Sequence, residues 1–211
     1  MVYLEESEVV AIIAQTDRST LEGQRDHLLL SLLYNTGARI QEALNLRPED
    51  FHLASPTHVR LLGKGRKERI APLWPETARL VAAFVKRQSH GSEEHLFRNR
   101  YGAGLTASGF RFRLRNYVKA AAMTQPSLSR KKVTPHTFRH TIAVHLVAAG
   151  VDVTVIRSWL GHAHLDTTNL YAEANIETQR KALEKADPRL RNGKRPRWKR
   201  DADLLAWLDS L

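Results

Sequence analysis

The sequence predicts an α+β fold that is mainly helical and includes one small antiparallel β-hairpin. Most of the apolar residues recur at helical spacing, between glycine and proline residues that are typical of helix ends. Residues 58–73 instead alternate between apolar and polar side chains, and Gly63-Lys64-Gly65-Arg66 in their middle suits a hairpin turn. At 211 residues the chain is long enough for a sizeable core, and we expect one domain followed by a tail.

Most of the expected helices have a start or stop signal. Ser7 can cap the first helix, Gly37 can end the second, and Pro75 suits the first turn of a later one. Asp152 can cap the helix that Gly161 ends. The expected helices are a first one capped by Ser7, then 24–35, a short one starting at 39, 75–88, 107–122, 135–149, 152–160, one after 171 through 185, and 201–211.

The composition favours a polyanionic partner. The chain has 33 Lys and Arg against 22 Asp and Glu, a net charge of +11 and an isoelectric point near 10.2. A solvated basic surface would give the same balance, so charge alone does not identify nucleic acid. The absence of cysteine excludes disulfides and thiolate metal sites. No apolar run reaches the length of a membrane span and Met1 opens no signal peptide, so we expect a soluble protein with no membrane contact.

Residues 134–171 carry the side chains with the clearest chemical meaning. His136 and Arg139 are three residues apart and project from one side of the same expected helix. His162 follows the next helix, and Tyr171 comes nine residues after it. Arg and His donors can hold an anionic phosphate, and a nearby phenol can attack that phosphate. The spacing therefore indicates an anion site beside a tyrosine.

Six segments of the sequence belong together as motifs: Asn35 to Glu42, Gly63 to Arg69, Pro72-Leu73, His136-Thr137-Phe138-Arg139-His140, Leu160-Gly161-His162, and Tyr171. In this order they resemble the catalytic half of the tyrosine recombinases, the phage integrase family. The resemblance spans roughly residues 4–183. It implies the tyrosine-recombinase catalytic fold, in which the β-hairpin carries Lys64, and a bacterial or phage-encoded protein of the cytoplasm that is associated with the nucleoid.

The resemblance also implies a catalytic set, which consists of Arg39, Lys64, His136, Arg139, His162 and Tyr171. The two arginines and His162 would stabilise the nonbridging phosphate oxygens, His136 would accept the proton of the phenol, and Lys64 would protonate the leaving 5′ oxygen. Glu42 would orient Arg39 from behind. The product would be a 3′-phosphotyrosine and a 5′ hydroxyl, so no metal or nucleotide cofactor is expected.

Further basic residues are candidates for contacts with double-stranded DNA. They lie near the hairpin tip, on one face of the expected helix over 107–122, and in the basic loop before residue 134: Arg66, Lys67, Arg111, Arg115, Lys131 and Lys132. Each has an ordinary structural alternative. A lysine at a hairpin tip is commonly a solvated charge, the arginine stems can cover apolar surface, and Arg39 with Glu42 can be a surface ion pair.

Three rival functions follow from the same residues. His136 and His140 are four apart on a helix, as in a zinc site, but Thr137 stands where a zinc protease would need Glu. A type IB topoisomerase would use the same cleavage and religation chemistry without strand exchange. A non-catalytic DNA-binding protein could keep the fold, although it would not need the ordered set of Lys, Arg, His and Tyr.

The domain organisation expected from the sequence has three parts. Residues 1–187 form the catalytic domain, 188–200 a basic linker with seven Lys or Arg from Arg189 onward, and 201–211 a C-terminal docking helix. We expect no N-terminal core-binding domain in this chain. The apolar last helix needs a docking surface, which the resemblance places on a neighbouring protomer in a dimer to tetramer on DNA. In a free monomer the alternative is that it folds back onto its own domain.

Overall fold

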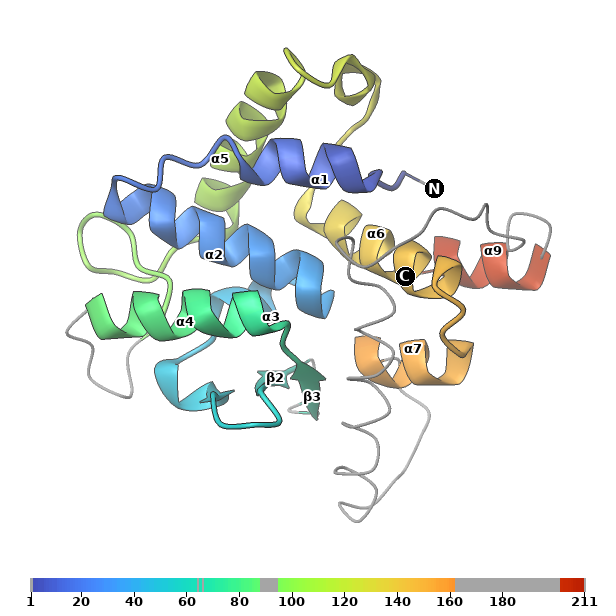
Figure 1. The fold of residues 1–211 in the computed structure, drawn as a ribbon, viewed down its shortest axis with the longest axis horizontal. Helices are drawn as coiled ribbons and strands as arrows, with labels where there is room; N and C mark the ends of the chain where they lie inside the picture. Colours follow the sequence, from blue (N-terminus) through green and yellow to red (C-terminus); the bar gives the residue numbers. More distant parts are fainter. Residues whose placement is uncertain (1, 64, 66, 88–94, 162–201, 211) are drawn as a thin grey trace.

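The computed structural model describes residues 2–63, 65, 67–87, 95–161 and 202–210 (Figure 1). The sequence-predicted helix over 171–185 and the linker over 188–200 lie outside these residues. The helices are α1 (Glu6–Ile13), α2 (Leu21–Thr36), α3 (Ile40–Leu44), α4 (Pro75–Arg87), α5 (Ala107–Ala121), α6 (Pro135–Ala148), α7 (Val153–Leu160) and α9 (Ala202–Asp209), with the short 3-10 helices η1 (Pro48–Asp50) and η3 (Pro126–Arg130).

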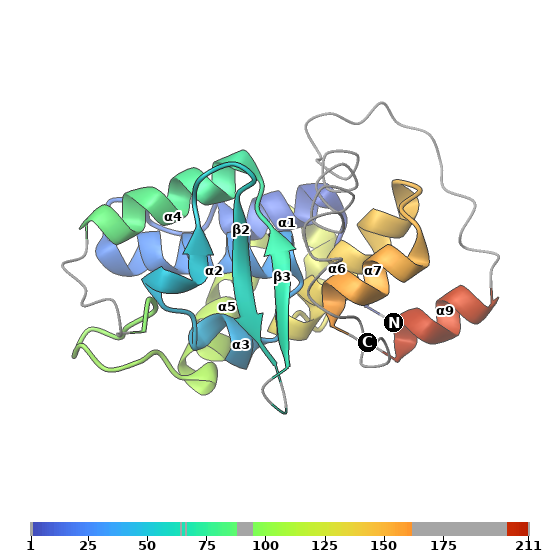
Figure 2. The same ribbon diagram turned by 90° about the horizontal axis from the view of Figure 1, so that it is seen from below.

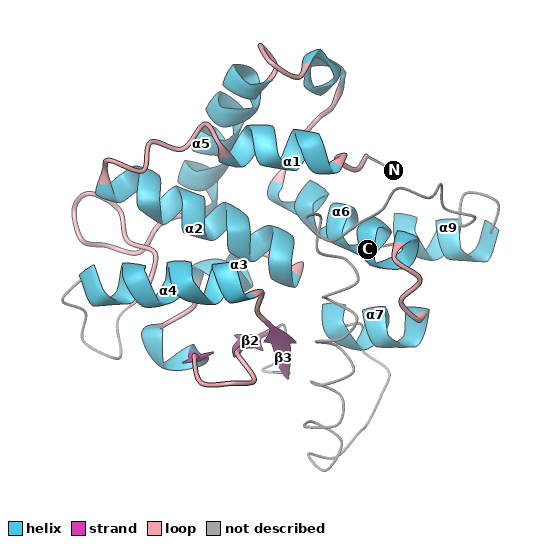
Figure 3. Cartoon of the chain, in the orientation of Figure 1, coloured by secondary structure: helices cyan, strands magenta, loops and turns pink. Residues whose placement is uncertain are grey.

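A small antiparallel sheet completes the fold. Its strands are β1 (Phe51–His52), β2 (His58–Leu62) and β3 (Glu68–Pro72), in the order β1-β2-β3. The strands β2 and β3 form the predicted hairpin, in which Leu61 is opposite Arg69. Figure 3 shows the sheet at one edge of a mainly helical molecule, and Figure 2 shows β3 on the side of the sheet that faces α6 and α7. The predicted fold class is therefore confirmed.

Helix α2 lies at the centre of the core and packs against both α4 and α6. Its fully buried leucines include the consecutive Leu28, Leu29 and Leu30, which lie about 100° apart around the helix axis. A helix that is apolar on most of its circumference is stable only when other elements cover it. This burial places the end of α2, at Gly37, deep in the molecule beside α6 and α7.

Several element boundaries differ from the sequence prediction. The N-cap of α1 is Glu5 rather than Ser7, because the carboxylate of Glu8 accepts the backbone N–H of Glu5 at 2.7 Å. Helix α2 begins at Leu21, three residues before the predicted start, since the Thr20 hydroxyl accepts the N–H of Gly23 at 3.0 Å. The strand β1 was not predicted, and the basic loop before residue 134 contains η3.

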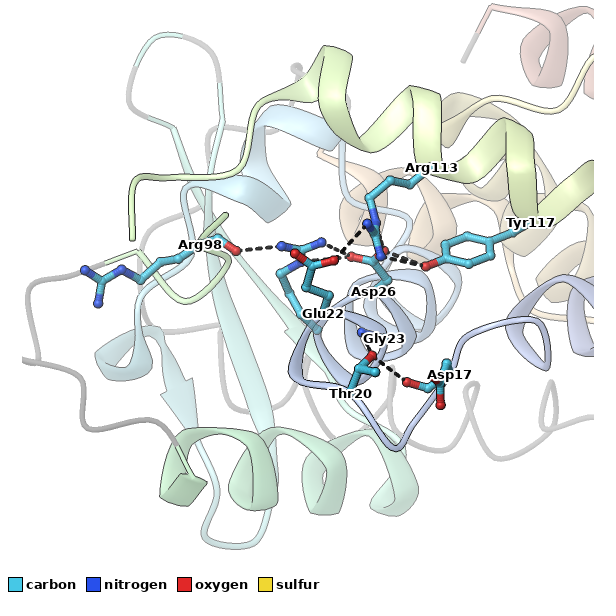
Figure 4. A network of polar contacts seen from close by, with 9 residues as sticks. Asp17, Thr20, Glu22, Gly23, Asp26, Arg98, Arg113 and Tyr117 are labelled. Atoms are coloured by element: carbon cyan, nitrogen blue, oxygen red, sulfur yellow. Dashed lines mark hydrogen bonds and ion pairs between the residues drawn. The ribbon is translucent and has the colours of Figure 1, made fainter. Parts of the chain in front are cut away.

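A buried carboxylate joins α5 to α2 (Figure 4). The side chain of Asp26 is 0% exposed and accepts hydrogen bonds from Arg25, Arg113 and the Tyr117 hydroxyl, the last at 2.7 Å. Burial and the charge of Asp26 raise the pKa of Tyr117 to about 12, so the phenol remains a donor at neutral pH. This network holds the Arg113 side chain against α2.

None of the described helices combines the length and apolar character that crossing a bilayer requires.

Candidate active site

Arg39 lies at the junction between α2 and α3, where the chain turns sharply. Gly37 ends α2 in the left-handed conformation, with φ 60°, and Arg39 is the N-cap of α3. Glu42 accepts the backbone N–H of Arg39 at 2.9 Å through Oε2 and its guanidinium Nη1 at 3.1 Å through Oε1. The side chain of Arg39 is 45% exposed, whereas that of Glu42 is 5% exposed. Glu42 thus holds Arg39 from below and leaves its guanidinium facing outward.

Arg69 is a member of the same cluster that the sequence did not single out. Its Nη2 donates to Glu42 Oε2 at 2.8 Å, and its Nε donates to the Trp159 carbonyl oxygen at 3.0 Å. Burial would raise the pKa of Glu42, but the charge of Arg69 and the hydrogen bonds from both arginines outweigh it, so that pKa lies below its ordinary value. Arg69 is the last residue of the segment Gly63 to Arg69, one of the six motifs that carry the family resemblance. Its place in that motif was the only indication in the sequence that it belongs to the site.

Arg139 is fully buried on α6 and links the ends of two other helices. Its Nη1 donates to the Gly37 carbonyl oxygen at 2.7 Å, and its Nη2 donates to the Leu160 carbonyl oxygen at 2.6 Å. Burial, with the charges of Arg39 and Arg69, lowers the pKa of Arg139 to about 9, so the guanidinium stays charged at neutral pH. Arg139 therefore fixes the surrounding backbone and adds positive charge to the cluster.

His136 is exposed on the first turn of α6, close enough to Arg139 and Arg39 to feel their charges. Burial of part of the ring and the charges of Arg139 and Arg39 lower its pKa below the ordinary value of 6.5. The imidazole is consequently neutral at pH 7 and able to accept a proton. Its ring packs edge to face against His140, with ring centroids 4.4 Å apart.

The structure thus brings together four of the sequence-predicted site residues: Arg39, Glu42, His136 and Arg139. Arg69 joins them, and three arginines with one carboxylate leave a net charge of +2 in this cluster. Arg39 is partly exposed and His136 is neutral, and both belong to this positively charged cluster. The cluster can therefore bind an anion. Among the described residues, no group of three His, Asp or Glu side chains is arranged to hold a metal ion.

Lys64, Arg66, His162 and Tyr171 lie outside the described residues. Gly63 precedes Lys64 and Gly161 precedes His162, and both glycines are described and lie beside the arginine cluster. The N–H of Gly63 donates to the Lys67 carbonyl oxygen at 2.8 Å and closes the hairpin, and a Cβ added to Gly63 would lie 3.3 Å from Glu42 Oε1.

Gly161 directly precedes His162 and lies against Arg69. A Cβ at Gly161 would be 2.8 Å from Arg69 Cδ, closer than real Cβ atoms approach such an atom. The segments that lead to Lys64 and to His162 therefore both start beside the arginine cluster.

The other basic candidates divide into two groups. A pocket of about 460 Å³ lies between α5 and the segment before α6, and Arg111, Arg115, Lys131 and Lys132 are among its lining residues. Arg111, Arg115 and Lys132 are exposed there, whereas the Lys131 ammonium donates to Glu8 Oε2 at 2.6 Å and to the Tyr3 carbonyl oxygen at 2.9 Å. The carboxylate of Glu8 therefore balances the charge of Lys131 within the protein. Lys67 is exposed on the hairpin.

The C-terminal helix α9 packs against α6 of the same chain. Leu208 is fully buried, and the guanidinium of Arg157 on α7 lies over the Trp207 ring at 5.2 Å from its centroid. In this single chain the helix therefore folds back onto its own domain, the arrangement that the sequence left open for a monomer.

Known proteins are similar in sequence to this chain over most of its length. Among similar curated proteins, a provisionally named integrase/recombinase of Sinorhizobium fredii is 39% identical over 99% of this chain and 62% of the relative. Tyrosine recombinase XerC of Staphylococcus haemolyticus is 34% identical over 87% of this chain and 61% of the relative. This chain thus spans less than two thirds of the length of either relative.

Solved structures show the same fold. XerA recombinase has a TM-score of 0.66 and 29% identity, covering 89% of this chain and 66% of that chain. An integrase from mycobacterium phage Brujita has a TM-score of 0.69 over 99% of this chain and 63% of that chain, and at 18% identity it supports the fold alone. The phage integrase family model matches residues 2–178. The match covers most of the 211 residues, and the chain belongs to the phage integrase family.

Proposed function

We propose that this chain is a site-specific DNA recombinase or integrase that cleaves and rejoins DNA strands through a 3′-phosphotyrosine intermediate. The observation that carries the proposal is the anion site formed by Arg39, Arg139 and His136 around Glu42, from which the segments toward Lys64 and His162 depart. The family match includes Tyr171. The relatives reported above are named as recombinases or integrases, which supports strand exchange over the topoisomerase and non-catalytic alternatives.

The proposed reaction is a transesterification at one phosphodiester. The phenol oxygen of Tyr171 attacks phosphorus as its proton passes to His136, and the P–O bond to the 5′ oxygen breaks as Lys64 donates a proton to that oxygen. Arg39 stabilises the charge on the nonbridging oxygens, and Arg139 adds positive charge from its buried position. Rejoining is the reverse of these transfers, so the energy of the phosphodiester is conserved.

Double-stranded DNA is the proposed substrate and main partner. The exposed Arg111 and Arg115 on α5, with Lys132 across the pocket, supply phosphate-binding charge near His136. Arg66 and Lys67 add charge at the hairpin. Lys131 is a weaker candidate, because Glu8 balances its ammonium group. A Tn1549 transposon integrase of the same fold was solved in complex with circular intermediate DNA, which supports DNA as the partner.

The proposed assembly on DNA is a dimer to tetramer of this chain. We propose that residues 1–187 form the catalytic domain, that 188–200 form a basic linker, and that the helix in 201–211 transfers from its own α6 to the α6 of a neighbouring protomer. The apolar contacts of Leu208 and Trp207 would then be made between subunits rather than within one.

Covalent capture of DNA tests the proposed function. The chain is incubated with a pool of end-labelled duplexes that carry a nick beside a randomised stretch, so that the short cleaved fragment diffuses away and traps the phosphotyrosine. We expect labelled DNA that stays with the protein in hot detergent, with the same yield in EDTA because cationic side chains stabilise the phosphate. No covalent complex, or one that requires a divalent metal, would contradict the proposal.

A further inference from the structure

We propose that Arg69 is a positioning residue for strand cleavage: it holds Glu42 so that the guanidinium of Arg39 stays available to the scissile phosphate. This inference rests on the proposed function and deepens it. The guanidinium of Arg69 itself faces the protein interior, and its side chain is 10% exposed.

Arg69 and Arg39 share the carboxylate of Glu42. Oε2 of Glu42 accepts from Arg69 Nη2 at 2.8 Å and from the backbone N–H of Arg39 at 2.9 Å. Only Oε1 is left for the Arg39 guanidinium, which reaches it through Nη1 at 3.1 Å. Arginine and carboxylate otherwise tend to pair through two parallel hydrogen bonds. Arg69 occupies the oxygen that such a pair would need.

This arrangement leaves donor capacity on the guanidinium of Arg39. A guanidinium has five N–H donors, and within the described residues one hydrogen bond uses this group of Arg39. At 45% exposure, its other N–H groups are open to a ligand. A two-bond pair with Glu42 would use more donors and bring the opposite charges together, and the arginine would then be a weaker partner for phosphate.

Arg69 also connects this carboxylate to α7. Its Nε donates to the Trp159 carbonyl oxygen at 3.0 Å, in the last turn of α7, where helix carbonyls lack intrahelical partners. Arg139 Nη2 donates to the next carbonyl oxygen, that of Leu160, at 2.6 Å. Two guanidinium groups therefore cap one helix end, where positive charge is favourable.

Stability alone gives a poor account of this arrangement. Burying an ion pair costs desolvation that its attraction scarcely offsets, and apolar side chains of similar volume are often as stabilising. A simple link between β3 and α7 would need a bond to Trp159 but none to the carboxylate that holds Arg39. The second bond is explained if Arg69 sets the position and charge of that carboxylate.

The test compares two substrates in single-turnover cleavage, both built from a duplex recovered by covalent capture. One has the normal scissile phosphodiester. The other has a methylphosphonate, in which a methyl group replaces one nonbridging oxygen and removes the negative charge that Arg39 stabilises. The variants are Arg69→Ala and Arg69→Lys, since lysine keeps the charge but has no planar fork to bond both acceptors. The control is Arg60→Ala on the adjacent strand β2, an arginine that is 49% exposed and bonds Asp50 at 3.0 Å.

We expect Arg69→Ala to cleave the phosphodiester about 10- to 100-fold more slowly than the unchanged chain, as for loss of a group that orients a catalytic side chain. The dissociation constant for DNA should stay nearly constant, and the deficit should shrink markedly on the methylphosphonate. Arg69→Lys should show the same dependence on substrate with a smaller deficit, and it serves alone if the alanine variant does not fold. Arg60→Ala should match the unchanged chain on both substrates.

An equal deficit on the two substrates would show that Arg69 merely supports the fold, and full activity of both variants on the phosphodiester would show that it is dispensable. Either result overturns the inference while the unchanged chain still cleaves and the proposed function stands. If the unchanged chain forms no covalent complex with either substrate, the proposed function fails and this inference fails with it.

Discussion

His136 shows how a single side chain is tuned by its surroundings. It is placed on the first turn of α6 by Pro135 and the Thr134 cap, and its ring sits near the guanidinium groups of Arg39 and Arg139. Partial burial and those two charges disfavour the imidazolium form. A histidine that is neutral at physiological pH suits the role of proton acceptor for a phenol.

The rate of cleavage should therefore fall on acidification with a midpoint below pH 6.5. The pKa of His136 is lowered from that value by burial and by Arg139 and Arg39, so the neutral, proton-accepting form persists at lower pH than for a free histidine. Single-turnover rates of covalent complex formation between pH 5 and 8 measure the midpoint. A midpoint above 6.5, or an unchanged profile in His136→Gln, would exclude this histidine as the base.

Gly37 is the second position where one residue controls the site. Its φ is 60°, and an added Cβ would lie 2.5 Å from Leu160 Cδ2 and 3.0 Å from Ile142 Cγ2. No side chain fits there unless α6 or α7 moves. The close approach brings the carbonyl oxygen of Gly37 within reach of Arg139.

Gly37→Ala should lower the free energy of unfolding by more than the roughly 1 kcal/mol that a left-handed alanine costs by itself. Gly150→Ala is the matched control, because Gly150 has φ 75° but, among the described residues beyond its own chain neighbours, no atom lies within 4 Å of an added Cβ. Urea unfolding of both variants measures the difference. Equal losses in the two variants would mean that the contact with Leu160 relaxes without cost.

At the scale of elements, the short-range features were predictable and the long-range ones were not. Gly37, Asp152 and Gly161 act through the backbone next to them, so their roles as helix ends follow from sequence and are confirmed. The pairing of Arg39 with Glu42, three residues apart, is equally local and is also confirmed.

Contacts between distant segments account for what the sequence missed. The bond from Arg69 to Trp159 spans 90 residues, and that from Arg113 to Asp26 spans 87. Which arginine meets which carbonyl or carboxylate depends on how β3, α5 and α7 pack. The pattern of residues within one segment cannot predict such pairings. Arg69 therefore appeared in the sequence only as part of the motif Gly63 to Arg69.

Asp26 is the element-scale feature with the largest expected effect on stability. Asp26→Asn should destabilise the fold by about 3–5 kcal/mol, because it leaves buried Arg25 and partly buried Arg113 without their shared carboxylate. Glu22→Gln is the control, since Glu22 is 44% exposed and its ion pair with Arg113 should contribute at most about 1 kcal/mol. Thermal unfolding measures both. A small effect of Asp26→Asn would show that the network reorganises around a neutral amide.

At the scale of the whole molecule, the proposed exchange of α9 would link the state of one chain to assembly. Its Leu208 is buried against the same chain, and full burial of such a side chain is worth about 1.5–3 kcal/mol. That is small enough for the helix to leave one α6 and large enough to hold it on another. An exchange between protomers would keep these contacts while joining subunits.

Deleting Ala202 to Leu211 should weaken cooperative binding to paired sites and leave binding to a single site nearly unchanged. The linker and catalytic domain still supply the charge that binds phosphate, but the contact between protomers is lost. Gel mobility shifts on one-site and two-site duplexes, with Leu208→Ala as a milder variant, measure the cooperativity. Unaltered assembly of the truncated chain would refute the exchange, and so would its unfolding, which would show α9 to be an integral part of the domain.

The central claim is that Tyr171 attacks the DNA backbone, and covalent capture with Tyr171→Phe tests it most directly. Phenylalanine removes the attacking oxygen alone, so we expect DNA binding close to that of the unchanged chain and no complex that survives denaturant. Tyr101→Phe, at a tyrosine that is 77% exposed, should be captured as efficiently as the unchanged chain. A denaturant-resistant complex formed by Tyr171→Phe would contradict the account, because another residue would then be the nucleophile.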